Sequence, residues 1–426
     1  MVVALLLPPV LQRCVFQHNN AFRENRFITA LHLAEAGIEE GIWHLSYDKQ
    51  DAWTGWNISN ADQYIKPTSA LLDVDGEQIG EYTITIDDPI PLGTSINLGG
   101  LGGALPFPVT SKSEPTVTAR AGVPDLESAG SEIREVVVKA RARTIFSLGL
   151  FSDQDLELGG TTEVNSYDSR LGPYNETTNS GHNGDAGSNN NILLNGTPLI
   201  DGDAAAGGSI VLTGQNAEIT GEVEGGMTKI ELPAVNAYVE AAKLNNNNNE
   251  IPKAVKPNGQ QSNAYNPATG FLDVAANCTL TLPGGTKENP KVYYLSGAKL
   301  NGNSKIVMDG YAIIYTDGNL DFSGGTVINN AGNGPPERLV VYSSGNINTE
   351  VKINGGAGFS GVVYAPDAQV TFSGGGNIFG AAVGGKVNMQ GNAQFHYDEA
   401  LGEVGLIAYF EVREWVERAS PDPSSG

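Results

Sequence analysis

Pairs of acidic residues are the first candidates for chemistry in this sequence. Asp153 with Asp155, and Asp317 with Asp321, have a spacing that could hold two carboxylates together. Glycoside hydrolysis needs such a pair, one as acid and one as base or nucleophile. Both pairs flank turns that lead to glycine, where aspartate is common because its side chain bonds the local backbone. We therefore interpret them as turn residues and expect no catalytic residue.

Metal and cofactor sites are weakly indicated. The five histidines show no metal-ligand spacing, and His32 and His44 lie too far apart on one helix to share an ion. Calcium-binding Gly-Gly-x-Gly-x-Asp repeats are missing, which leaves Asp185, Asp201 and Asp203 as weak ligand candidates. The sequence has no Gly-x-Ser-x-Gly elbow, phosphate loop or dinucleotide fingerprint. We expect no metal, no cofactor and no enzymatic activity.

Charge and composition narrow the class of protein. The 25 basic and 48 acidic residues give a net charge of −23, which disfavours nucleic acid because its phosphates need a basic footprint. With 54 glycines in 426 residues, a helical bundle is excluded, whereas 40% apolar residues suffice for a sizeable core. Cys14 and Cys278 cannot form a disulfide framework, and we do not expect them to pair.

An amphipathic helix is expected near the N-terminus. Apolar residues recur every three or four positions and form one stripe: Phe27, Leu31, Ala34, Ile38, Ile42 and Leu45. This stripe packs either on the chain's own domain or on other subunits of a filament or membrane-bound assembly, and we predict that it is an assembly face. Upstream, Pro8-Pro9 interrupts an apolar run that is too short for a membrane span of roughly 18 residues.

The same helix carries a family resemblance. Ala30-Leu-His-Leu-Ala-Glu-Ala-Gly-Ile-Glu-Glu-Gly-Ile-Trp43 resembles the A-x-x-L-A-E-A-G-x-E-x-A stretch of PilX-type type IV pilus assembly proteins. In that family the stretch follows an N-terminal membrane helix. The resemblance implies a subunit that is anchored in the bacterial inner membrane before assembly and then lies in the pilus at the cell surface.

Residues 47–146 are expected to form a small mixed domain. Residues 81–87 and 133–144 alternate polar and β-branched side chains, as half-buried strands do. Between them, residues 93–124 are rich in Gly, Pro and Thr and are expected to form a long loop. Three basic residues at period two indicate a solvated strand face rather than an anion site: Lys139, Arg141 and Arg143.

From residue 147 onward, short β-rich runs alternate with glycine turns. Gly196 and Gly214 are 18 residues apart, and Gly355, Gly374 and Gly391 are 19 and 17 apart. A period near twenty favours a β-solenoid, in which inward apolar residues stack from one coil to the next. The alternative is a β-sandwich, whose turns usually recur every 8 to about 12 residues.

Further segments resemble the same family. Phe151–Gly160 and Asn165–Tyr174 are similar to the part that follows the pilus-type N-terminus. Three later segments resemble the C-terminal β-helical domain of the family: Tyr364–Gly374, Phe379–Lys386 and Phe395–Leu401. The order of these pieces implies a PilX-type protein with a C-terminal β-helix.

The sequence as a whole predicts an α+β, mainly β chain, with an N-terminal amphipathic helix, a small α/β-type mixed region and a right-handed β-helix. An insertion is expected between the coils, with a short helix at Tyr238–Leu244. The polar stretch that follows, residues 245–267, is expected to be a flexible spacer, with a partner-binding loop as the alternative. The expected segments are 1–46 (hydrophobic assembly helix), 47–146 (mixed domain), 147–232 (solenoid coils), 233–276 (helical and flexible insertion), 277–401 (solenoid coils) and 402–426 (C-terminal strand or helix and tail).

The expected function is that of a non-enzymatic structural or adhesive subunit of a type IV pilus or a related surface assembly. Its expected partners are other pilus or pilin-like subunits, bound through the N-terminal helix, and a surface ligand or glycan, bound through solenoid loops. Two other classes stay open, a carbohydrate-active β-helix enzyme and a self-polymerising β-solenoid scaffold.

Overall fold

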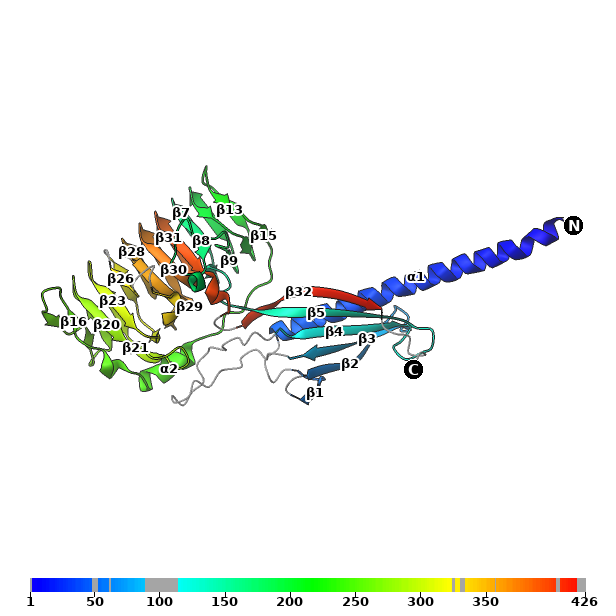
Figure 1. Cartoon of the computed structure of the whole chain (residues 1–426), viewed down its shortest axis with the longest axis horizontal. Helices are drawn as coiled ribbons and strands as arrows, with labels where there is room; N and C mark the ends of the chain where they lie inside the picture. Colours follow the sequence, from blue (N-terminus) through cyan, green and yellow to red (C-terminus); the bar gives the residue numbers. More distant parts are fainter. Residues whose placement is uncertain are drawn as a thin grey trace. The chain divides into compact units, whose positions relative to one another are not determined.

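The chain forms two compact units, and the second is inserted into the first. The structure is a computed structural model that describes residues 2–47, 53–60, 63–88, 114–323, 326–329, 334–356, 358–403 and 407–419 (Figure 1). The first unit comprises Met1–Thr94, Thr110–Arg143 and Tyr409–Gly426, and the second comprises Ser95–Val109 and Thr144–Ala408. The C-terminal segment thus belongs to the same unit as the N-terminal helix.

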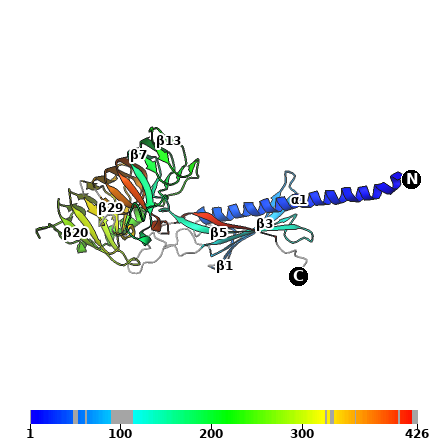
Figure 2. The ribbon, with the colours of Figure 1, turned by 45° about the horizontal axis from the view of Figure 1, so that its top comes forward.

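A long helix and a six-stranded sheet build the first unit. Helix α1 (Val2–Tyr47) packs against β3 and β4 (Figure 2). The strands lie in the order β1 (Asn57–Asn60), β2 (Gln63–Leu72), β3 (Gln78–Asp87), β4 (Thr116–Val123), β5 (Glu132–Thr144) and β32 (Ile407–Ala419). Lys139 of β5 forms a 2.8 Å ion pair with Glu414 of β32. The basic side of β5 is therefore used, in part, to hold the C-terminal strand.

Two glycines let α1 lie close to the sheet. A Cβ atom at Gly37 would lie 2.9 Å from the Cβ of Ala119, and one at Gly41 would lie 2.6 Å from a methyl group of Val117. Ala119 and Val117 are buried residues of β4. Both glycines belong to the motif that resembles the PilX-type proteins, so a contact between helix and sheet gives that motif a physical reason.

Three ladders of parallel strands build the second unit. The first contains β19 (Phe271–Val274), β22 (Gly297–Leu300), β25 (Leu320–Ser323), β28 (Glu350–Gly355), β7 (Leu156–Gly160), β10 (Ile192–Gly196) and β13 (Ile210–Leu212). The second contains β20 (Thr279–Pro283), β23 (Lys305–Asp309), β26 (Val327–Ile328), β31 (Gln394–Asp398), β8 (Glu163–Tyr167), β11 (Leu199–Ile200) and β14 (Glu218–Ile219). The third contains β21 (Lys291–Leu295), β24 (Ala312–Thr316), β27 (Leu339–Ser343), β6 (Leu150–Ser152), β9 (Ala186–Ser188), β12 (Ala204–Ala206) and β15 (Val223–Gly225).

Two long strands run through all three ladders, and short elements cover one end. The long strands are β29 (Gly358–Gly374) and β30 (Asn377–Gly391). The short elements at the end that carries β19 and β20 are β16 (Ala254–Val255), β17 (Gln261–Ser262) and β18 (Tyr265–Asn266), which pair in antiparallel fashion. The 3₁₀ helices are η1 (Ser169–Leu171), η2 (Asn248–Glu250), η3 (Pro336–Arg338) and η4 (Glu399–Glu403).

The rungs of this stack, each made of one strand from every ladder, do not follow the order of the chain. Strands β30 and β31, the last in the unit, pair with β6, β7 and β8, the first. The chain therefore fills one end of the stack up to β15, crosses to the other end and returns toward its starting point. Helix α2 (Asn236–Leu244) lies on the crossing segment and buries Val239 and Ala242 against the stack.

The crossing segment is built into the fold. The short helix predicted there is confirmed as α2. The stretch that was expected to be a flexible spacer is instead held by hydrogen bonds, because the backbone N–H of Asn247 donates to the carbonyl of Val292 at 2.7 Å. The Oη of Tyr364 donates to the carbonyl of Pro233 at 2.8 Å. Backbone and side-chain hydrogen bonds thus fix both ends of α2.

The turn glycines stack on one another, as their spacing predicted. Gly374 lies opposite Gly355 on one side and Gly391 on the other. Gly374 and Gly391 have φ of 90° and 82°, a conformation that favours glycine. A Cβ atom at Gly391 would also lie 3.0 Å from the backbone of Gly374. The φ of both residues, and the close approach at Gly391, therefore favour glycine at these two positions.

The predicted fold class is confirmed in its coarser part, a mainly β chain with an N-terminal helix. The apolar residues inside the first ladder form a continuous buried column: Leu272, Ala298, Leu320, Val351, Val370, Val387, Leu156 and Ile192. Because these strands pair in parallel, the β-sandwich does not describe the second unit.

Candidate functional site

The stripe predicted as an assembly face lies toward the chain's own sheet. Three of its residues are buried: Ala34, Ile38 and Leu45. The other three are half-buried: Phe27, Leu31 and Ile42. The guanidinium of Arg134 on β5 lies 3.7 Å from the centroid of the Phe27 ring. Packing on the chain's own domain therefore accounts for the buried half of the stripe, and the other three residues keep part of their surface exposed.

Glu40 of α1, which lies outside the apolar stripe, is bonded to the sheet. The Oη of Tyr82 donates to one carboxylate oxygen at 2.8 Å, and Lys66 forms an ion pair with the other. Partial burial raises the pKa of Glu40, but the bonds from Lys66 and Tyr82 outweigh it, so that the pKa is lowered. Burial and the bond to Glu40 raise the pKa of Tyr82 to about 12.

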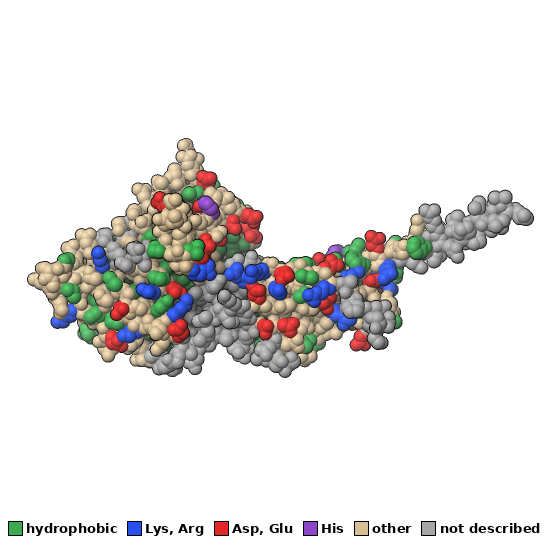
Figure 3. Space-filling view, in the orientation of Figure 1, with side chains coloured by type: hydrophobic (Ala, Val, Ile, Leu, Met, Phe, Trp, Pro, Cys, Tyr) green, Lys and Arg blue, Asp and Glu red, His purple; other side chains and the backbone are tan. Residues whose placement is uncertain are grey.

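The N-terminal part of α1 carries uncovered apolar side chains. Phe16 is 66% exposed and Phe22 is 54% exposed, and hydrophobic side chains are visible along this part of the helix (Figure 3). None of the described helices is apolar over enough residues to cross a bilayer. The side chain of Cys14 lies outside the described residues, and Cys278 is a buried free thiol.

Three of the four aspartates that could have served hydrolysis bond to neighbouring parts of the stack, and the fourth, Asp321, accepts from Ser323 of its own strand. Asp317 accepts hydrogen bonds from Lys243 of α2 and from the Oη of Tyr294, both at 2.8 Å. Burial raises the pKa of Asp317, but these two bonds outweigh it and lower the pKa. Asp153 accepts from Asn189 at 2.8 Å, and Asp155 accepts from three groups of the next rung.

The aspartates considered as calcium ligands link successive rungs. Asp185 accepts the backbone N–H of Asp203 at 2.9 Å, and Asp203 accepts that of Glu222 at 2.7 Å. Asp201 lies 2.7 Å from His182 and accepts from Thr220. In the part of the chain that the structure describes, no three His, Cys, Asp or Glu side chains gather as a metal site would require.

The two family-like motifs that contain Asn165 and His396 meet where the first and last rungs pair. His396 lies opposite Asn165 in the parallel pair of β31 and β8. Next to it, the Oη of Tyr397 donates to the carbonyl of Phe146 at 2.8 Å. This junction joins the segment that enters the second unit to the segment that leaves it.

His396 is buried among aromatic rings at this junction. Its ring centroid lies 3.8 Å from that of Tyr174 and 4.9 Å from that of Phe379. Its Nδ1 lies 2.6 Å from the Oδ1 of Asn165. Burial lowers the pKa of His396 to about 4, so the neutral ring donates the Nδ1 proton to Asn165.

Asp398 is a second buried ionisable group at the junction. Its Oδ1 accepts the backbone N–H of Ser169 at 2.9 Å and that of Ala400 at 3.2 Å. Burial raises the pKa of Asp398 although these bonds oppose the shift. Burial, and then the nearby Asp398, raise the pKa of Tyr167. We interpret the junction as a structural contact that holds the first and last strands of the second unit together. The sequence did not predict this role for the two motifs.

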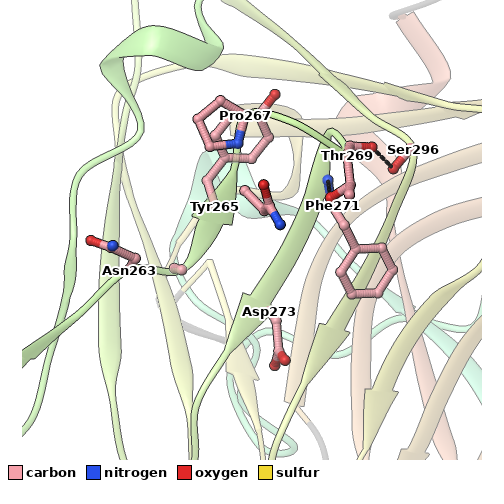
Figure 4. A pocket seen from close by; sticks show the side chains of 9 residues that line it. Asn263, Tyr265, Pro267, Thr269, Phe271, Asp273 and Ser296 are labelled. Carbon is pink, nitrogen blue, oxygen red and sulfur yellow. Dashed lines mark hydrogen bonds between the residues drawn. The ribbon is translucent and has the colours of Figure 1, made fainter.

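An open cavity lies at the covered end of the stack, and its volume is about 680 Å³. The hairpin of β18 and β19 and the turn before β22 supply its walls (Figure 4). Its lining combines three rings with amide, hydroxyl and carboxylate groups: Asn263, Ala264, Tyr265, Asn266, Pro267, Thr269, Phe271, Asp273 and Ser296. A cavity of this size is within the range of small-molecule sites, about 300–1,000 Å³.

A smaller cavity of about 300 Å³ adjoins it. The two share Asn263, Ala264, Tyr265 and Pro267. A partner-binding loop was the alternative prediction for the segment 233–276, but none of these residues was predicted to line a site. The hairpin turn Asn266-Pro-Ala-Thr-Gly270 was the available signal.

Residues 213–404, less than half of the chain, match a family model described as "Domain of unknown function (DUF7305)". No curated protein matches the sequence.

Three solved structures show similarity to this chain. The competence-associated pilin ComZ from Thermus thermophilus has 12% identity and a TM-score of 0.26, with 92% of this chain and 98% of that chain covered. The ice-binding protein LeIBP from an Arctic yeast has 12% identity and a TM-score of 0.26, covering 60% and 93%. The ice-binding protein of the Antarctic ascomycete Antarctomyces psychrotrophicus has 14% identity and a TM-score of 0.21, covering 58% and 93%.

Proposed function

We propose that this chain is a non-enzymatic structural or adhesive subunit of a bacterial type IV pilus or a related surface assembly. The observation that carries the proposal is the insertion of the second unit between β5 and β32 of a helix-and-sheet unit. The helix that would enter a filament and the stack that would meet the surroundings are thereby separate units of one chain. The PilX-type resemblance of the helix agrees with this division.

The assembly contact is assigned to the N-terminal part of α1. Phe16 and Phe22 are exposed there, and an uncovered apolar helix face favours packing against another helix. The half-buried members of the stripe, Phe27, Leu31 and Ile42, extend this surface toward the sheet. On this proposal the chain is held at the inner membrane before assembly and lies at the cell surface afterwards.

The second unit is interpreted as a right-handed β-solenoid that serves as the display module. Parallel ladders, stacked turn glycines and continuous apolar columns support this interpretation. The acidic pairs support the non-enzymatic part, because Asp153, Asp155 and Asp317 are engaged in bonds within the stack. Cleavage of acidic or neutral polysaccharides by the purified chain would overturn that part.

Photo-crosslinking in the bacterium that carries the gene tests the assembly role. A photoreactive residue replaces Phe22, and a matched control replaces Thr177, an exposed residue of the second unit. We expect the chain in sheared surface filaments, with position 22 crosslinked to a filament subunit and position 177 not. Absence of the chain from the filaments, or equal crosslinking at both positions, would show that the proposal is wrong.

A further inference from the structure

We propose that the 680 Å³ cavity at the covered end of the stack binds a neutral carbohydrate. The inference gives the proposed display module a ligand class, and it rests on the adhesive part of the proposed function.

Rings form the apolar part of the lining, and neighbouring contacts hold them in place. The Oη of Tyr265 accepts a hydrogen bond from the Nδ2 of Asn248 at 2.8 Å. The ring of Phe271 lies against Gly297, where an added Cβ atom would be 2.9 Å from a ring carbon. Figure 4 shows Tyr265 and Pro267 on one side of the site and Phe271 on another. Rings that are already ordered lose little conformational entropy when a ligand stacks on them.

Polar groups of the lining keep bonding capacity for a ligand. Ser296 donates its hydroxyl proton to the carbonyl of Thr269 at 2.7 Å, which leaves its lone pairs available. The Oδ1 of Asn266 accepts the backbone N–H of Ala268, which leaves the two donors of its amide nitrogen. One oxygen of Asp273 accepts from Asn301 at 2.7 Å, which leaves the other oxygen.

The combination matches a sugar better than an anion. A sugar ring has an apolar C–H face that can pack on an aromatic ring, and a rim of hydroxyls that both donate and accept. The cavity offers donors and acceptors together, and its one charged lining group, Asp273, is an anion. In this cavity a phosphate or a uronic acid would meet a carboxylate and no basic residue of the lining, which disfavours such ligands. Lys253 lines only the smaller adjoining cavity.

Titration of the full chain with neutral and acidic sugars tests the proposal. The probes are the methyl glycosides and short oligomers of glucose, galactose, mannose and N-acetylglucosamine, with an oligomer of a uronic acid as the charged comparison. Binding is followed by calorimetry and by saturation-transfer NMR. We expect saturable binding of at least one neutral probe and none of the uronic acid.

Two variants locate the site. Asn263 is exposed, and its side chain makes no hydrogen bond to the described part of the chain that Asn263→Ala would break, so this variant is expected to weaken binding several-fold with unchanged thermal stability. Tyr265→Ala removes the stacking surface and is expected to weaken binding by about tenfold or more. Asn348→Ala, at an exposed asparagine outside the cavity, is the matched control and is expected to bind normally.

Three results would overturn the inference. They are no binding of any neutral probe at millimolar concentration, binding of the uronic acid alone, and binding that neither Asn263→Ala nor Tyr265→Ala reduces. These results are independent of the crosslinking at position 22, so the sugar site can fail while the assembly role stands. Loss of crosslinking with intact sugar binding would reject the assembly role instead.

Discussion

At the scale of single residues, the buried imidazole of His396 connects pH to the stability of the second unit. Its pKa is about 4 in the folded chain and about 6.5 in an unfolded one. Between these values the unfolded state binds more protons, so stability falls as the pH falls. The groups around the ring are Asn165, Tyr174 and Phe379, none of which supplies a charge to a protonated ring.

We predict that the second unit loses on the order of 2–3 kcal/mol between about pH 7 and pH 4 through His396. The raised pKa of Asp398 acts in the opposite direction, because a carboxyl that is protonated in the fold favours low pH. The variant His396→Asn should therefore show a smaller loss over this range, even if it is less stable at neutral pH. Urea unfolding followed by hydrogen exchange of β8 and β31 measures the difference.

The control for this prediction is His182→Asn. His182 is an exposed histidine on the same unit, beside Asp201. Its removal should leave the acid-dependent loss of stability as large as in the unaltered chain. Equal pH dependence in the His396→Asn variant and the unaltered chain would contradict the role given to His396.

At the scale of elements, the contact between α1 and the sheet depends on small residues. We predict that Gly41→Leu destabilises the first unit by about 1–3 kcal/mol, because its side chain would overlap Val117. All four tryptophans, Trp43, Trp53, Trp56 and Trp415, belong to the first unit. Tryptophan fluorescence during urea unfolding therefore reports on this unit without interference from the stack.

Ala36→Leu is the matched control for Gly41→Leu. Ala36 is an exposed position of the same helix, where leucine has nearly the helix propensity of alanine. Its unfolding midpoint should stay close to that of the unaltered chain. If both variants unfold alike, the tight packing of α1 at Gly41 is not important for stability.

The C-terminal strand β32 is the second element whose role can be tested. It pairs with β5, its Phe410 is buried, and the backbone N–H of Phe410 donates to the hydroxyl of Ser46 on α1. We predict that deletion of residues 407–426 speeds hydrogen exchange in β5 and lowers the tryptophan-detected midpoint. Exchange in the ladders of the second unit should stay as it is, and unaltered exchange in β5 would argue against the pairing.

Much of each element could be predicted from sequence, because periodicity reports on burial. The glycine spacing predicted the column of Gly355, Gly374 and Gly391, since only residues at equivalent turns recur in this way. The helical stripe was also visible, but an apolar face has the same pattern whether it meets its own sheet or another subunit. The burial of Ile38 could thus not be told from an assembly contact.

The order of rungs and the cavity could not be predicted. A repeat shows that rungs stack, but it does not show which rung is next to which, so the pairing of β31 with β8 is visible only in the fold. The residues of the cavity, such as Asn263 and Phe271, lie in a non-repeating segment. No period marks them, and their proximity depends on how the crossing segment covers the stack.

At the scale of the whole molecule, the two ends of the stack differ. Antiparallel strands β16 to β18 cover one end. At the other end, β13, β14 and β15 have no further strand beside them among the described residues, and Val211 and Val223 are exposed. An open edge of this kind can pair with another chain, and natural proteins often block it with charge. Acidic side chains gather near this end (Figure 3), and residues 171–228 contain no Lys or Arg.

We predict that the exposed glutamates of this last rung keep the stack from pairing end to end. They are Glu218, Glu222 and Glu224. Changing all three to glutamine removes three like charges from the edge and should cause concentration-dependent association, measured by sedimentation velocity. Added salt should likewise promote association of the unaltered chain, because at 0.1 M it screens the repulsion between charges that lie more than about 10 Å apart.

The control variant changes three exposed glutamates elsewhere, Glu77, Glu176 and Glu288, and has the same net charge as the first variant. If the control associates equally, net charge rather than the open edge limits self-pairing, and if neither associates, the edge is protected by its geometry.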